Sequence, residues 1–223
     1  DNEINSVFHW LFVHVLRLYS DIEKYFGNSQ IAEQALNDAK KISNTVTEMF
    51  WNNNRGAYAD DLDHTSFSEH SQIMAILSGL AKMENQKILS ETLFNDKDLL
   101  RATIYFSHYY FEVCRMLENS KAFWDRMSMW YEIEENDFKT VCESTLPTRS
   151  DCHAWSAHPL FHYYATILGI RPMEYGFNKV EVKPLLGKLK YAKGSMVHIK
   201  GNIDIELGAG SEKLTGSIYL PEG

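Results

Sequence analysis

The chain has 223 residues, of which 44% are hydrophobic, and its formal net charge is −8. This length is enough for one large or two small domains with a substantial core. No run of about 18 apolar residues occurs, so we expect no membrane span. The acidic balance, without a basic stripe, argues against a nucleic-acid partner.

Apolar residues recur at helical spacing as far as Leu168, and this pattern predicts seven helices joined as antiparallel hairpins. The apolar stripes of the first two are Phe8, Leu11, Phe12, Val15, Leu16 and Tyr19, then Ile31, Ala35, Ala39, Ile42, Val46 and Met49. The third to fifth stripes are Ile73, Met74, Leu77 and Leu80, then Ile88, Leu89 and Leu93, then Leu100, Thr103, Phe106, Tyr110, Val113 and Leu117. The last two are Phe123, Met127, Trp130 and Tyr131, then Leu160, Tyr163, Tyr164, Ile167 and Leu168. We expect N-caps at Ser120 and Ser156, Pro159 in the first turn of the last helix, and Gly169 just after it.

After Arg171–Pro172 the period changes from helical to alternating. The segments 180–184, 196–200, 203–207 and 214–220 each resemble a strand, and Gly201–Asn202 has the composition of a tight hairpin turn. The pattern therefore predicts an α+β chain, with a helical domain over residues 1–172 and a β module over 173–223. An odd number of helices leaves one without a hairpin partner, and so few strands cannot close a sandwich or a barrel. We therefore interpret the chain as part of a larger fold.

The segment 148–159, TRSDCHAWSAHP, combines a charge pair, a thiol, two imidazoles and an indole immediately before a predicted helix. Backbone N–H groups at a helix N-terminus favour anionic or hydroxyl-rich ligands, so this segment is either a ligand site or a buried structural loop. Glu143 lies nearby between apolar neighbours. It is a candidate general base, and a salt bridge to Arg149 is an equally good interpretation.

Two other kinds of chemistry have weaker signals. Cys152 and His153 are adjacent, and adjacent side chains rarely face one another, so a thiol nucleophile is not expected. His158 and His162 are one helical turn apart and have the spacing to share a metal, but a third ligand is not evident. We therefore expect neither a metal nor another cofactor.

Several segments resemble the α-L-rhamnosidases of glycoside hydrolase family 78. The resemblance is specific from Thr140 to Pro172 and looser in the first hundred residues. The segments that carry it are Arg149–Pro159, Phe106–Glu112, Trp124–Met127, Thr140–Glu143, Leu168–Pro172, Gly176–Phe177 and Pro184–Gly187.

This resemblance implies part of a barrel of six α/α hairpins, followed by an incomplete antiparallel β-sandwich module. It implies an inverting hydrolase that cleaves terminal α-L-rhamnose from rhamnosides by general acid/base catalysis. By the match, Glu143 is the catalytic base, while His153, Trp155 and Arg149 bind a rhamnose-containing glycoside or polysaccharide. Nothing here matches the acidic motif that holds the family's general acid, so we expect the fragment alone to be inactive and to self-associate through exposed barrel surface.

Two alternatives remain open. One is a non-catalytic carbohydrate-binding or scaffold module, in which aromatic side chains hold sugar and no water is activated. The other is an α-solenoid interaction domain with a β appendage, which would not need the cluster of residues 149–155. A bacterial protein of the cytoplasm or periplasm is the expected setting, although the localisation itself is not readable from the residues.

Overall fold

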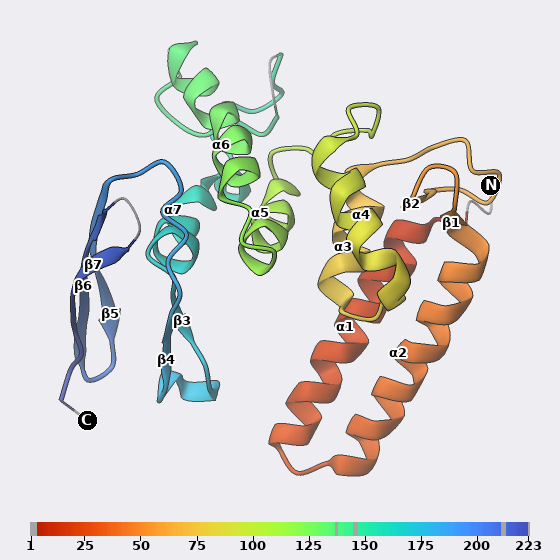
Figure 1. The fold of residues 1–223 in the computed structure, drawn as a ribbon, viewed down its shortest axis with the longest axis horizontal. Helices are drawn as coiled ribbons and strands as arrows, with labels where there is room; N and C mark the ends of the chain where they lie inside the picture. Colours follow the sequence, from red (N-terminus) through yellow and green to blue (C-terminus); the bar gives the residue numbers. More distant parts are fainter. Residues whose placement is uncertain (1–3, 137, 145–146, 211–212, 223) are drawn as a thin grey trace. The chain divides into compact units, whose positions relative to one another are not determined.

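The computed structural model of the protein describes residues 4–136, 138–144, 147–210 and 213–222. The outer ends of the two predicted domains, residues 1–3 and 223, lie outside these ranges. The described chain is α+β, as predicted, with helices and small antiparallel sheets (Figure 1). It divides into two compact units, Asp1–Ala102 and Thr103–Gly223. The division near Pro172 stays a prediction. None of the helices in the described ranges has the length and apolarity needed to cross a membrane.

The first unit is built on a long helical hairpin, whose two helices run side by side with a third helix against the first (Figure 1). Trp10 is fully buried and meets the ring of Tyr58 edge-on at 4.8 Å. The elements of this unit are α1 (Ser6–Tyr25), α2 (Ser29–Phe50), β1 (Trp51–Asn52), β2 (Ala57–Tyr58), α3 (Glu69–Ser78) and α4 (Met83–Asn95).

The apolar stripe predicted for α1 is largely exposed within this unit. Phe8 is 70% exposed and Phe12 is 51% exposed, whereas Trp10 and Val13 on another face are fully buried. The helix is therefore apolar on more than one side, and helical periodicity alone does not identify which side packs against α2 and α3.

Asp60 is buried beneath the start of α1 and organises the polar loop that follows β2. Its Oδ1 accepts hydrogen bonds from Ser68 Oγ at 2.8 Å and from Ser71 Oγ. Ser6 Oγ lies 2.8 Å from Ser71 Oγ and donates to Ala59 O at 2.6 Å. A buried carboxylate needs such partners, and here they join the starts of α1 and α3 to the loop.

The described part of residues 1–172, predicted to form helical hairpins, also contains strand pairing at three places, one of which is the strand β3 (Ile170–Pro172) at the end of this range. The two-residue strands β1 and β2 pair antiparallel between α2 and α3, around the turn predicted over residues 52–56. One parallel bridge also joins Ser68 to Leu100. Strands this short carry no period-2 pattern, so alternation could not reveal them.

The second unit contains the remaining helices and the larger sheets. Its helical elements are α5 (Ser107–Met116), α6 (Ser120–Glu135), a 3₁₀ turn η1 (Ala154–Ala157), α7 (Pro159–His162), a π-helical turn η2 (Tyr163–Ile167) and a second 3₁₀ turn η3 (Tyr175–Phe177). Its strands are β3 (Ile170–Pro172), β4 (Val180–Val182), β5 (Tyr191–His198), β6 (Gly201–Ala209) and β7 (Leu214–Tyr219).

Three predicted helix starts are corrected by the structure. Helix α5 begins at Ser107, seven residues after the first residue of its predicted stripe. The N-cap of α6 is Asn119, whose Oδ1 accepts from Ala122 N at 3.0 Å, so Ser120 is the first helical residue. Ser156 does not cap α7. It lies inside η1, and α7 begins after His158 with Pro159 in its first turn, as expected for that proline.

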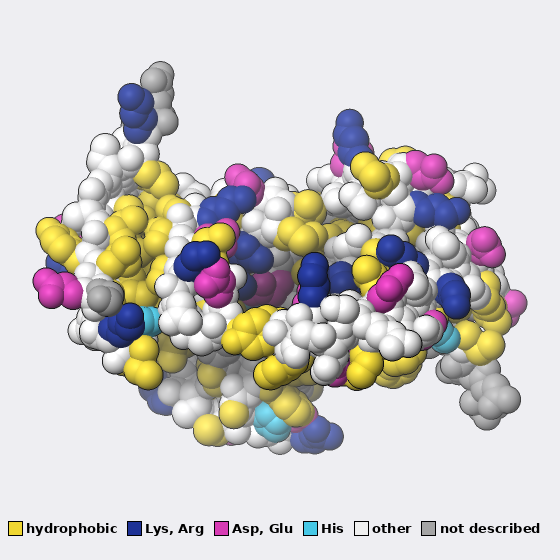
Figure 2. Space-filling view, turned by 90° about the horizontal axis from the view of Figure 1, so that it is seen from below, with side chains coloured by type: hydrophobic (Ala, Val, Ile, Leu, Met, Phe, Trp, Pro, Cys, Tyr) yellow, Lys and Arg dark blue, Asp and Glu magenta, His cyan; other side chains and the backbone are white. Residues whose placement is uncertain are grey.

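The strands form two antiparallel sheets, one of β3 and β4 and one ordered β5–β6–β7. His198 pairs with Gly201, so the turn between β5 and β6 is Ile199–Lys200 and Gly201–Asn202 begins β6, which corrects the predicted turn. Ile203, Ile205 and Leu207 alternate as the buried face of β6. Hydrophobic side chains also gather beside this sheet, at the left of Figure 2.

Gly169 ends the last helical turn with a φ of +71°, as predicted for a residue after a helix. A Cβ there would overlap the carbonyl group of Lys183 and the nitrogen of Pro184. The two backbone segments are in close contact, and Lys183 N donates to Gly169 O at 3.0 Å. This close approach joins η2 to the residues after β4.

We expect Gly169→Ala to lower the free energy of unfolding by about 1–2 kcal/mol from left-handed backbone strain and by about 1–3 kcal/mol more from displaced backbone. Gly176→Ala is the matched control, because Gly176 has a φ of +81° and only ordinary contacts. Urea unfolding of both variants measures the difference. Equal losses would show that the approach of Lys183 does not constrain Gly169.

Candidate active site

Glu143 and the segment 148–153 come together because two extended stretches pair across a loop. Glu143 N donates to Ser150 O at 2.9 Å, and His153 N donates to Val141 O at 2.8 Å. Cys142 between them is fully buried in a small core formed with Ile104, Met129 and Ile133. The Cys142 side chain packs into this core, whereas the neighbouring Glu143 side chain contacts Arg149.

Glu143 and Arg149 form a two-point ion pair. Arg149 Nε donates to Glu143 Oε2 at 2.9 Å, and Arg149 Nη2 donates to Glu143 Oε1. The Glu143 side chain is 12% exposed and that of Arg149 is 83% exposed, so the arginine covers the carboxylate from the solvent side. The hydrogen bonds from Arg149 lower the pKa of Glu143, and the charge of Arg149 and the field of His153 act in the same direction. Of the two interpretations of Glu143, the salt bridge is present in the structure, and the role as base stays a prediction.

The rings of His153 and Trp155 are in tilted contact just after this pair. Their ring centroids are 3.9 Å apart, and Tyr105 lies 5.5 Å from Trp155 on the centroid measure. Trp155 is 44% exposed. His153 Nδ1 is buried and has no hydrogen-bond partner among the described residues. An accessible indole beside an imidazole combines an apolar platform with a polar group, which suits a polyhydroxylated ligand.

A cavity of about 620 Å³ begins at Trp155 and extends between α7 and β5. Its other lining residues include His158, Phe161, Tyr164 and Met196. Glu143, Arg149 and His153 do not line it. The structure thus brings Glu143 to Arg149 and His153 to Trp155, and Trp155 alone of the four predicted site residues lines the cavity.

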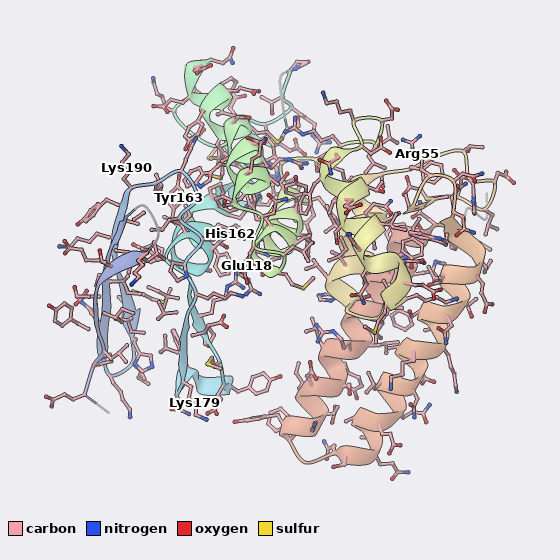
Figure 3. The ribbon with its side chains drawn as sticks, viewed as in Figure 1. Arg55, Glu118, His162, Tyr163, Lys179 and Lys190 are labelled. Carbon is pink, nitrogen blue, oxygen red and sulfur yellow. The ribbon has the colours of Figure 1, made fainter. Side chains whose placement is uncertain are left out.

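The structure also groups three histidines that the sequence did not bring together. His108 on α5 has its Nδ1 3.1 Å from Nε2 of His162, and His158 completes the cluster. Figure 3 shows His162 on α7 beside α5. Burial lowers the pKa of His158 to about 4 and that of His162 to about 2, and it also lowers the pKa of His108. All three rings are therefore neutral at physiological pH.

His108 was missed because it is 50 residues away from His158 in the chain. The available signal was its place four residues before Glu112 in an aromatic-rich helix. Glu112 lies next to this cluster, with its Oε1 4.0 Å from His162 Nδ1. Both carboxylate oxygens of Glu112 accept hydrogen bonds from Arg171 in a two-point ion pair.

Replacing Arg149 with Met should raise the pKa of Glu143 towards its ordinary value of about 4.3. Because the folded-state pKa is below the unfolded one, the pair's contribution to stability is present at neutral pH and is lost as the pH falls through the folded pKa. Carboxyl NMR titration measures the pKa directly, and urea unfolding at neutral and acid pH measures the linkage.

Lys179→Met is the matched control, because it removes an exposed ion pair with Glu174 in the same unit. The pKa of Glu143 should stay low in that variant. An unchanged pKa in Arg149→Met would mean that Arg149 does not set the protonation of Glu143.

No family model and no curated protein matches the chain. Solved structures do match it. A glycoside hydrolase family 78 rhamnosidase of Bacillus sp. GL1 aligns with 97% of this chain at 22% identity and a TM-score of 0.88. An α-L-rhamnosidase from Dictyoglumus thermophilum aligns with 95% at 23% identity and a TM-score of 0.76. A rhamnosidase from Klebsiella oxytoca with rhamnose bound aligns with 70% at 17% identity and a TM-score of 0.60.

The chain spans 25%, 25% and 33% of these three proteins, respectively. At such identities the likeness establishes the fold and does not transfer an activity. The resemblance noted in the sequence is thus confirmed in three dimensions: this chain has the fold of one part of the α-L-rhamnosidases of glycoside hydrolase family 78.

Proposed function

We propose that this chain is the C-terminal part of the catalytic barrel, with the start of the C-terminal β domain, of an inverting glycoside hydrolase that removes terminal α-L-rhamnose from rhamnosides. The observation that supports this is the alignment of almost the whole chain with a quarter of a rhamnosidase at a TM-score of 0.88. In this proposal residues 1–172 supply hairpins to a six-hairpin α/α barrel, and residues 173–223 begin a β-sandwich.

Glu143 is the proposed general base. Inversion requires a carboxylate that deprotonates water on one face of the sugar, and a general acid at about 6.5–9.5 Å that protonates the leaving oxygen. A glutamate is charged at neutral pH at its ordinary pKa, as a base requires. Arg149 lowers the pKa of Glu143 further, so the carboxylate becomes a stronger base when Arg149 is displaced. Arg149 is largely exposed, so solvent screens its attraction to Glu143, and sugar and water can displace it at small cost.

His153 and Trp155 are the proposed sugar-binding residues, and Arg149 borders them. The unpartnered Nδ1 of His153 supports a hydroxyl partner, and the exposed indole supports a sugar ring above it. The general acid is proposed to lie outside this chain, because no segment here resembles the acidic motif that holds it in the family. No cofactor is needed for this mechanism.

A non-catalytic carbohydrate-binding module is the second candidate. The observation that favours it is the two-point pairing of Glu143 with Arg149, because a carboxylate held in this way is less available to take a proton from water. In that candidate the same His153 and Trp155 hold sugar and no bond is cleaved.

The isolated chain should show no turnover of an aryl α-L-rhamnoside, because loss of acid catalysis alone costs about 10²–10⁴-fold in rate. Release of the aryl group by the purified chain measures this. Light scattering should at the same time detect self-association, since Phe8, Phe12 and Tyr19 of α1 are exposed within their unit. Robust hydrolysis would mean that the general acid lies within these 223 residues.

In the longer enzyme to which we assign this chain, Glu143→Gln should lower kcat by about 10²–10⁴-fold with little change in KM, because the base is lost and the shape is kept. His153→Ala should instead raise KM, since a hydrogen bond left unmade in a desolvated site costs about 1–3 kcal/mol. Steady-state kinetics on an aryl rhamnoside separates the two effects.

Glu174→Gln is the matched control, because Glu174 is an exposed, ion-paired carboxylate elsewhere in the unit, and its turnover should equal that of the wild type. A thermal melt of each variant excludes unfolding as the cause. Near-normal turnover in folded Glu143→Gln would eliminate Glu143 as the base, and Glu134 or Glu135 would become the next candidate.

A further inference from the structure

His108, His158 and His162 place one ring nitrogen each within 4.8 Å of one another. The closest pair, His108 Nδ1 and His162 Nε2, is 3.1 Å apart. Two nitrogens bound to one tetrahedral zinc ion at about 2.0–2.1 Å are separated by roughly 3.3 Å. The cluster therefore needs only small side-chain movements to surround an ion. Among the described residues no cysteine or carboxylate belongs to the group.

The protonation of His158 is determined by its neighbour. His158 Nε2 lies 2.9 Å from Ile104 O, and a carbonyl oxygen only accepts, so Nε2 carries the hydrogen. In the neutral ring Nδ1 then has a free lone pair. This Nδ1 is buried and has no hydrogen-bond partner in the described part of the chain. Buried polar atoms are normally hydrogen-bonded, so packing alone does not explain why His158 Nδ1 has no partner there.

His162 is oriented in a similar way. Its Nδ1 lies 2.9 Å from Thr166 Oγ1 and 4.0 Å from Glu112 Oε1, so a hydrogen on Nδ1 leaves the lone pair on Nε2. The hydrogen shared between His162 Nε2 and His108 Nδ1 can move to His108 Nε2, after which both facing nitrogens hold lone pairs and no net charge changes. Metal-binding histidines commonly donate their second N–H to a carbonyl, hydroxyl or carboxylate in this manner.

We propose that His108, His158 and His162 bind one divalent transition-metal ion of the zinc class, with solvent at the fourth position. Neutral imidazoles suit Zn²⁺, Co²⁺, Ni²⁺ and Cu²⁺ better than the oxygen-seeking Mg²⁺ and Ca²⁺. His158 also lines the cavity of about 620 Å³ beside Trp155, whereas His108 and His162 do not. The ion connects α5, which holds His108, to the start and end of α7. The inference does not depend on the proposed glycosidase activity, because the site shares none of its residues.

The test is titration of the chelator-treated, folded chain with ZnCl₂ by calorimetry and with CoCl₂ by visible absorption. We expect one ion per chain and ligand-field bands of four- or five-coordinate cobalt. At a free zinc concentration about 100 times Kd, the melting temperature should rise by about 5–10 °C.

His108→Phe and His158→Phe should each weaken zinc binding by at least about 100-fold, the upper end of the loss expected for a second-shell partner. His198→Phe is the matched control. His198 is a half-buried histidine of the same unit that contacts Phe177 O at 2.9 Å and meets the Phe177 ring edge-on, and its loss should leave zinc affinity unchanged. Thr166→Val should weaken binding by about 10–100-fold, because it removes the hydroxyl beside His162.

If either phenylalanine variant fails to fold, zinc X-ray absorption of the wild-type chain decides the question, since three imidazoles give a distinct scattering pattern. Absence of stoichiometric binding to the wild type would overturn the proposal. So would equal zinc affinity in His108→Phe, His158→Phe and the wild type, or a wild-type spectrum without three imidazole ligands.

Discussion

The ion pair between Glu112 on α5 and Arg171 on β3 is the interaction on which the centre of the second unit depends. Arg171 donates to both carboxylate oxygens, at 2.6 and 2.9 Å, and its Nε donates to Ala165 O at 2.7 Å. Both side chains are only 17% exposed. Removing one partner of a buried pair costs on the order of 3–5 kcal/mol, so α5, the π-helical turn and β3 are held in one arrangement. The histidine cluster lies directly against this pair.

The same unit places ionisable groups in two contrasting environments. The Glu143 carboxylate lies in a loop beside an exposed arginine, and hydrogen bonds from that arginine lower its pKa and keep it charged. The three histidines lie among aromatic rings, and loss of water lowers their pKa values and keeps them neutral. A charged carboxylate suits proton transfer and ligand contact, whereas neutral imidazoles suit coordination. The second unit therefore holds two groups of ionisable residues with different charge states.

Much of the secondary structure was predictable from the residues. Each of the seven helices and each strand after Pro172 is present, because apolar spacing and glycine positions act locally. Helix ends were less predictable: Asn119 competes with Ser120 for the cap of α6, and both residue types accept hydrogen bonds equally well. The π-helical turn and the two-residue strands are too short to carry a periodic pattern, so no local pattern signals them.

For the candidate site, the sequence alone determined which residues are candidates: the segment 148–159 and Glu143 were identifiable by their residue types and by resemblance. Only the tertiary structure decided which side chains are in contact with one another. It paired Glu143 with Arg149, left Ser156 inside a 3₁₀ turn, and brought His108 within 3.1 Å of His162 across 54 positions. The physical reason is that periodicity encodes which side of an element is buried, whereas contacts between elements depend on how the whole chain packs.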